Sequence, residues 1–262
     1  MKPYASAQPL RSREMSLTAD LVFSCARLES DPGPDPSKRP LTSSDYRKAA
    51  IELDTEFPSE ALWVFAYGSL IWKNSFAATE SRRATAFGWH RSFCMTRTRW
   101  RGSPAQPGLM MALERGGRCD GVAYRMPEGS RIEQIENLLR REIEYEDAVP
   151  FMRWIHVTDG VDRWRALGSW VGPVGSEVQA KLSLAAVSKI LARACGHVGS
   201  GADYLFQTVR HLEMLGIRDR NLWDLQRLVA QEIRMSNGDP HLPSSEAIQA
   251  ADLCNFADAL ES

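Results

Sequence analysis

One carboxylate in the middle of the chain occupies a position suited to proton transfer. Glu142 follows Ile135 by seven residues, Leu138 by four and Leu139 by three, so on a helix it lies on or beside their apolar stripe. A carboxylate directed inward loses hydration, which raises its pKa toward the range in which a general acid/base operates. The spacing also fits a glutamate at the edge of the core that pairs with an arginine. Both interpretations remain open at this point.

A second candidate is the turn Tyr67-Gly68-Ser69-Leu70, which follows an apolar run over residues 62–67. The run predicts a buried strand, and a glycine in the turn lets the backbone N–H groups approach an anion closely. Most such turns bind nothing. Ser69 is not expected to be a nucleophile, because the G-x-S-x-G pattern is absent. No histidine is marked as a base or metal ligand: His90, His156, His197 and His211 are expected to be structural.

A third feature is a segment, residues 81–101, that contains arginines and aromatic residues but no acidic residue. Such a mixture could bind single-stranded RNA, with steep sensitivity to salt. It could equally line the solvent face of a strand. The balance of 32 Lys and Arg against 33 Asp and Glu argues against a globally basic nucleic-acid binder. The arginines are Arg82, Arg83, Arg91, Arg97, Arg99 and Arg101.

Strands are expected to dominate the centre of the chain. Apolar residues alternate from Ala86 onward, although Arg91 interrupts their parity. Residues 109–114 and 119–126 predict a hairpin that turns at residues 115–118. Residues 153–157 and 163–171 supply further strands, and the cluster indicates a small barrel.

Helices are expected around these strands, giving an α+β architecture. Ser130 and Glu133 have capping-box spacing before the helix that carries Glu142. Three more helices are predicted over residues 183–196, with Ser183 as N-cap, and over about 203–215 and 222–235.

The chain is expected to divide into three parts. Residues 1–58 form an N-terminal extension with two short helices and a proline-rich linker at 31–40, residues 59–236 form the main domain, and residues 237–262 form a loose tail. The start lacks a signal peptide and no run is long enough to span a bilayer, so we expect a cytoplasmic protein without a membrane partner. Its cysteines are scattered and odd in number, which fits a reducing compartment: Cys25, Cys94, Cys119, Cys195 and Cys254.

Five blocks of the sequence resemble, in the same order, those of the ChaC family of γ-glutamylcyclotransferases. Together they run from about Leu62 to about Arg227, and this co-linearity is more specific than any single motif. Two departures are Ala66, where the family usually has glycine, and Ser103, where it has threonine. The blocks are residues 63–72 (WVFAYGSLIW), 101–108 (RGSPAQPG), 121–125 (GVAYR), 141–143 (REI) and 201–205 (GADYL) with 215–217 (LGI).

The resemblance implies a fold, an activity and a site. The fold is a small mixed β-barrel of the γ-glutamylcyclotransferase type with surrounding helices. The activity is cleavage of glutathione to 5-oxoproline and cysteinylglycine, in which the glutamyl α-amine attacks the γ-carbonyl of its own molecule. Other γ-glutamyl amino acids or γ-glutamylamines are the alternative substrates, and an arginine-rich RNA-binding protein is the alternative of another class.

In this reading Glu142 is the general acid/base, and neither a cofactor, a metal nor a covalent intermediate is needed. Tyr204 could instead bury its ring in the core, with its hydroxyl satisfied. The dispersed apolar residues of the helices weakly favour a monomer. The implied substrate-binding residues are Tyr67, Gly68, Ser69, Leu70, Arg101 and Tyr204.

Overall fold

The computed structural model describes residues 13–57, 61–74, 76–172 and 182–238 of the chain. Most of the expected C-terminal tail, from residue 239 on, lies outside the described residues, as do the first twelve residues of the expected extension. None of the helices in the described ranges has both the length and the apolar character needed to cross a bilayer.

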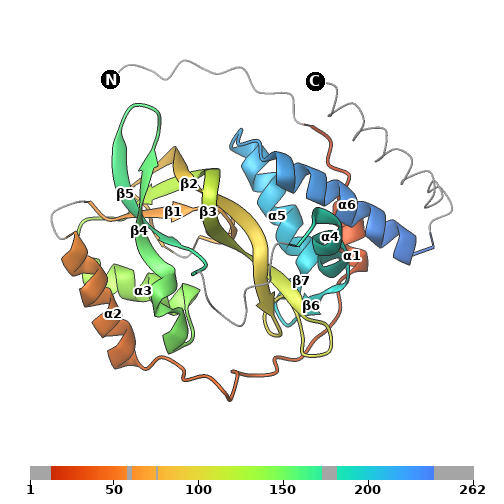
Figure 1. Cartoon of the computed structure of the whole chain (residues 1–262), viewed down its shortest axis with the longest axis horizontal. Helices are drawn as coiled ribbons and strands as arrows, with labels where there is room; N and C mark the ends of the chain where they lie inside the picture. The colour runs from red at the N-terminus through yellow and green to blue at the C-terminus, as the bar shows by residue number, and fades with distance from the viewer. Residues whose placement is uncertain (1–12, 58–60, 75, 173–181, 239–262) are drawn as a thin grey trace.

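A closed five-stranded barrel forms the centre of the fold (Figure 1), which confirms the expected α+β architecture and small barrel. The barrel closes through a parallel pairing of the first and last strands at Val64 and Leu167, and its other pairings are antiparallel. In the order around the barrel the strands are β1 (Trp63–Ala66), β3 (Gly108–Arg125), β2 (Glu80–Arg97), β4 (Met152–Thr158) and β5 (Arg163–Ser169).

The hairpin expected at residues 115–118 is wrong: β3 runs through these residues without turning. Gly116 and Gly117 both have positive φ, and so does Gly88 on the facing strand β2, where the register shifts between Phe87 and Trp89. The glycines therefore accommodate an irregularity in a long ladder rather than a chain reversal. The chain reverses at residues 98–107, which join β2 to β3.

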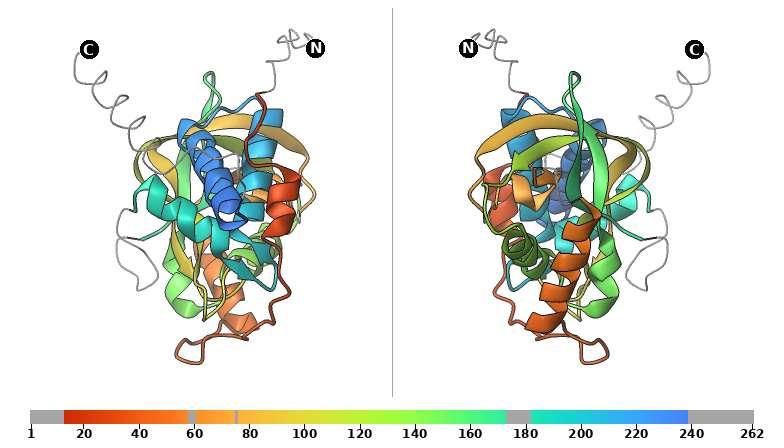
Figure 2. Two further views of the ribbon diagram at one scale, coloured as in Figure 1. Left: turned by 90° about the vertical axis from the view of Figure 1, so that its right-hand side faces the viewer. Right: turned by 90° about the vertical axis from the view of Figure 1, so that its left-hand side faces the viewer.

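The helices gather in two groups, shown in Figure 1 and in the side views of Figure 2. In one group α2 and α3 pack against each other, and in the other α4, α5 and α6 contact one another and α1 contacts α5 and α6. The short strands β6 (Cys195–Gly196) and β7 (Gly199–Ser200) precede α5. The helices are α1 (Ala19–Ser24), α2 (Ser43–Glu56), α3 (Arg131–Glu142), α4 (Leu184–Arg193), α5 (Gly201–Met214) and α6 (Arg220–Ser236).

Helix caps follow the sequence at one expected position and depart from it at another. Ser183 caps α4 as expected, because its side chain accepts the N–H of Ala186. Ser130 makes no side-chain cap for α3, and its ψ of 86° departs from the extended backbone of Ser183. A complete capping box forms instead at Thr42 and Asp45, at the start of α2.

The N-terminal segment joins the two groups of helices. Residues 25–42 run from α1 to α2 along one edge of the molecule (Figures 1 and 2). Leu17, just before α1, is fully buried, and its N–H donates to Oε1 of Gln226 on α6 at 2.8 Å. On α2, Tyr46, Ala50 and neighbouring residues belong to the same hydrophobic core as the barrel. The segment thus contributes to the core from both of its ends.

Candidate active site

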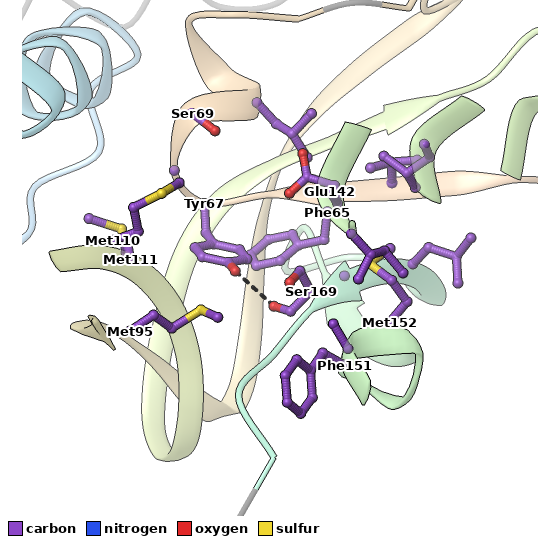
Figure 3. A pocket seen from close by; sticks show the side chains of 18 of the residues that line it. Phe65, Tyr67, Ser69, Met95, Met110, Met111, Glu142, Phe151, Met152 and Ser169 are labelled. Carbon is purple, nitrogen blue, oxygen red and sulfur yellow. Dashed lines mark hydrogen bonds between the residues drawn. The ribbon is translucent and has the colours of Figure 1, made fainter. Parts of the chain in front are cut away.

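A cavity of about 90 Å³ lies between the barrel strands β1 and β5, the β2–β3 hairpin and the end of α3. Figure 3 shows side chains from these elements turned toward one another around it. The short 3₁₀ helices η1 (Ser69–Ile71) and η2 (Glu146–Phe151) also contribute to its wall. Six of the seven residues implied by the family resemblance line this cavity: Tyr67, Gly68, Ser69, Leu70, Glu142 and Tyr204.

Glu142 is the last residue of α3, and its carboxylate points into the cavity (Figure 3). Leu138 and Leu139, one turn earlier, are buried in the core, so the apolar stripe of α3 carries Glu142 inward. Its side chain keeps 20% of its exposure, and Nε of Arg141 donates to its Oε1 at 3.0 Å. Burial raises the pKa of Glu142, while the charge of Arg141 opposes the rise. The result is a carboxylate that water reaches only partly, as proton transfer requires.

The turn after β1 faces this carboxylate. The Tyr67 hydroxyl donates to the carbonyl oxygen of Ser169 at 2.8 Å, which ties the turn to the end of β5 (Figure 3). Helix η1 begins at Ser69, and the first N–H groups of a helix have no acceptor within the helix. A Cβ added to Gly68 would lie 3.0 Å from Oη of Tyr204, so any larger residue would push the phenol away from the turn. The turn therefore offers backbone N–H donors beside a phenol.

Tyr204 projects from α5 and is buried, with its ring edge-on to Trp72 and Phe93. The hydroxyl and the backbone N–H of Ser69 lie close to its phenol oxygen and act to lower the pKa of Tyr204. Burial, together with the charge of Glu142, raises the pKa of Tyr204 to about 12, and the same two causes raise the pKa of Tyr67 well above its ordinary value. Both phenols therefore stay neutral near pH 7 and can donate hydrogen bonds.

Arg101 does not line the cavity. Its Nη1 pairs with Oδ2 of Asp203 at 2.5 Å and donates to the carbonyl oxygen of Ser200 at 3.1 Å, both at the start of α5. The guanidinium also lies 5.6 Å from the ring centre of Tyr204. The structure thus brings Arg101 behind Tyr204 rather than beside Glu142, where it supports the helix that carries the phenol.

The remaining arginines of the 81–101 segment do not form one basic face. Arg82 pairs with Glu80 and Asp159, and Arg99 pairs with Asp31 and Glu144. Arg91 is buried beside Asp219. Carboxylates from other parts of the chain therefore neutralise much of the charge that suggested RNA binding.

Part of the cavity wall has no distinguishing signal in the sequence. Within strands, methionine follows the same alternation as any core residue, so its periodicity carries no signal of a ligand pocket. Ser169 and Phe151 lie in segments without a motif. Nothing in the sequence distinguishes Arg97 from the other arginines of residues 81–101. The methionines of the wall are Met95, Met110, Met111 and Met152.

Comparison with known proteins places the chain among relatives of described activity. The chain is 37% identical to a glutathione-specific γ-glutamylcyclotransferase of Escherichia coli over 71% of its own length and 80% of that protein. It is 30% identical to γ-glutamylcyclotransferase 2-3 of Arabidopsis thaliana over 64% of its length and 88% of the relative.

The fold also matches a solved structure. The crystal structure of a selenomethionine-labelled γ-glutamyl cyclotransferase specific to glutathione from yeast superposes with a TM-score of 0.55 at 18% identity, covering 66% of this chain and 97% of that one. The family model described as ChaC-like protein matches residues 62–232, which include β1, Glu142 and Tyr204. The chain belongs to the ChaC-like protein family.

Proposed function

We propose that this chain cleaves glutathione to 5-oxoproline and cysteinylglycine, with Glu142 as general acid/base. The observation that carries the proposal is the position of Glu142, half-buried at the end of α3 in the same cavity as the Tyr67–Leu70 turn and Tyr204. Two relatives, from Escherichia coli and fission yeast, are named as glutathione-specific γ-glutamylcyclotransferases, which supports this substrate over other γ-glutamyl compounds.

The reaction needs proton transfer more than it needs a nucleophile from the protein. The α-amine of the glutamyl group attacks its own γ-carbonyl, the ring C–N bond forms, and the bond to the cysteine nitrogen breaks. Two protons pass in all from the α-nitrogen to the leaving nitrogen, because an ammonium becomes a ring amide while an amide nitrogen becomes an ammonium. Glu142 takes the first proton before attack and relays both to the leaving nitrogen. The enzyme also accelerates the reaction by holding the α-amine and the γ-carbonyl in contact.

Substrate is held by the turn and the phenols. The N–H groups of Ser69 and Leu70 bind the α-carboxylate, a role suited to the first turn of η1 next to a glycine. Tyr204 donates to the same head group in place of its contact with Ser69. The methionine side chains adapt to the cysteinyl part of the substrate, as flexible thioethers do in binding surfaces.

We also propose that the enzyme works in the cytoplasm as a monomer. The described cysteines Cys25, Cys94, Cys119 and Cys195 are all free thiols, as a reducing compartment permits.

The test is release of 5-oxoproline by the purified protein from glutathione, γ-glutamyl-alanine and a γ-glutamylamine, each measured by mass spectrometry. We expect turnover of glutathione, little affected by added salt and independent of RNA. Glu142→Gln should remain folded and lose about 10²–10⁴-fold in kcat, the usual contribution of a general acid/base. If the protein turns over the other two compounds but not glutathione, the proposed substrate is wrong. Near wild-type activity of Glu142→Gln would overturn the proposed mechanism.

A further inference from the structure

Arg91 is the most deeply buried charge next to the site, although it does not line the cavity. It lies on β2, and its side chain retains 2% of its exposure. A buried charge is tolerated only when it is paired and hydrogen-bonded. Arg91 is held by three separate elements, because the five N–H donors of a guanidinium form a rigid fork: Nη1 and Nη2 donate hydrogen bonds to two carbonyl groups, and Nε forms an ion pair with Asp219 without a hydrogen bond.

The first contact reaches the substrate turn. Nη1 of Arg91 donates to the carbonyl oxygen of Tyr67 at 3.1 Å, and Nη2 donates to the carbonyl oxygen of Asp120 on β3. The C=O and N–H of a trans peptide point in opposite directions. An arginine that holds the Tyr67 carbonyl therefore makes the N–H of Gly68 point away from β2. It also fixes the plane of the Tyr67–Gly68 peptide, and the directions of the next two N–H groups, of Ser69 and Leu70, depend on that plane.

The second contact reaches the other group of helices. Nε of Arg91 lies 3.2 Å from Oδ2 of Asp219, while Oδ1 of Asp219 accepts the N–H of Leu222 as the N-cap of α6. Asp219 thus serves two purposes with its two oxygens. Through this pair the start of α6 fixes the guanidinium, and the guanidinium fixes the turn.

We infer that Arg91, held by Asp219, is a positioning residue that orients the Tyr67–Gly68 peptide so that the turn binds the α-carboxylate of the substrate. The inference rests on the proposed function. It means that a residue outside the cavity sets the geometry of the Tyr67–Leu70 turn that binds the α-carboxylate. Arg91 touches neither the substrate nor Glu142, so it acts on binding of the head group rather than on proton transfer.

The test compares Arg91→Lys with wild type in steady-state turnover of glutathione. Lysine keeps the charge but offers a point donor in place of the fork. A turn that binds the α-carboxylate contributes equally to ground and transition states, so its loss should raise KM about tenfold with kcat within about threefold. The dependence of kcat on pH should stay unchanged, because Glu142 is untouched. A merely structural role would instead lower the amount of active enzyme at constant KM.

Binding to the Glu142→Gln protein supplies a second readout, by calorimetry with glutathione and with 4-aminobutyryl-cysteinylglycine, which lacks only the α-carboxylate. Arg91→Lys should lower the affinity for glutathione about tenfold and the affinity for 4-aminobutyryl-cysteinylglycine less than about twofold. Equal losses for both ligands, or an unchanged KM, would overturn the inference.

Two further variants keep the test decisive. Asp219→Asn retains the helix cap, since asparagine caps as well as aspartate, and should raise KM in the same direction even if Arg91→Lys does not fold. Arg82→Lys is the control on the same strand, because Arg82 pairs with Glu80 and Asp159 and not with the turn; its KM should match wild type. Absence of 5-oxoproline from the wild-type protein would point to failure of the proposed function instead.

Discussion

The surroundings of Glu142 combine two opposing influences on one carboxyl group. Burial at the end of α3 disfavours the charged form, and the neighbouring Arg141 favours it, with burial the stronger of the two. A base must lose its own proton before it can accept one from the substrate, and an acid must release the proton it holds. A carboxylate with a raised pKa can do both, whereas a fully exposed glutamate is a weaker base.

The raised pKa of Glu142 predicts that this carboxylate destabilises the fold at neutral pH. Its pKa is higher in the folded protein than the ordinary 4.5, so the folded state binds the proton more tightly and the free energy of unfolding falls as pH rises between the two values. The cost is absent below the ordinary pKa and complete above the raised one. Glu142→Gln should therefore be more stable than wild type near pH 7, with the difference vanishing near about pH 4.

Urea unfolding of both proteins between these two pH values measures the effect. Glu136→Gln, on the same helix but with ion pairs to Arg140 and to Arg47 of α2, is the control and should gain no stability at neutral pH, because it loses these two ion pairs. A Glu142→Gln protein that is less stable than wild type at neutral pH would contradict the assignment of burial as the dominant cause.

Individual residues differ in how far the sequence reveals them. Spacing alone placed Glu142 on the inner stripe of its helix, since that depends only on the helical period. Arg91 and Arg101 could not be distinguished in the same way: both lie in arginine-rich sequence, and each is buried by contacts with distant acidic residues, Asp219 and Asp203. The packing of α5 and α6 decides which carboxylate each arginine contacts, and the local sequence does not indicate these pairs.

At the scale of elements, the position of Glu142 depends on α2 as well as on α3. The hydroxyl of Tyr46, on α2, donates to the carbonyl oxygen of Ile143 at 2.8 Å, one residue beyond Glu142. Ile143 is the C-cap of α3, and the last carbonyl groups of a helix have no partner within it. Tyr46 therefore satisfies a free carbonyl group and anchors the end of the helix that presents the carboxylate.

Tyr46→Phe should separate these two effects. Losing a buried hydrogen bond and leaving the Ile143 carbonyl unsatisfied should lower stability by about 1–2 kcal/mol, and looser placement of Glu142 should lower kcat about threefold with little change in KM. Tyr145→Phe is the matched control, because the Tyr145 hydroxyl accepts the N–H of Asp35 at an exposed position. Equal kinetics for the two variants would show that Tyr46 supports the core and not the site.

Elements with a strong period or cap were predictable, and those set by partners were not. The 3.6-residue period predicted α3, and Ser183 marked the start of α4. The glycines of residues 115–118 suggested a turn because a local pattern cannot show that Gly88, on another strand, supplies the matching irregularity. The parallel pairing of β1 with β5, which closes the barrel, joins segments a hundred residues apart and has no local signal either.

At the scale of the whole molecule, the N-terminal segment contributes buried residues to the main hydrophobic core, before α1 and along α2. Leu17 is fully buried against the helices that follow the barrel, and Gln226, almost completely buried on α6, accepts its N–H. Arg99, at the end of the β2–β3 hairpin, pairs with Asp31 in the proline-rich linker. Contacts of the segment, at Leu17 before α1 and at Asp31 in the linker, thus connect the two groups of helices across the barrel.

This arrangement predicts that the N-terminal segment stabilises the fold that carries the site without taking part in catalysis. Leu17→Ala should lower the free energy of unfolding by about 2–5 kcal/mol, because it removes a fully buried side chain and leaves a cavity, while KM and kcat of the protein that remains folded stay unchanged. Leu28→Ala, in the same segment at a fully exposed position, is the control and should have almost no effect. Urea unfolding monitored by tryptophan fluorescence measures both, and equal stability of the two variants would mean that residues 13–57 fold independently of the barrel.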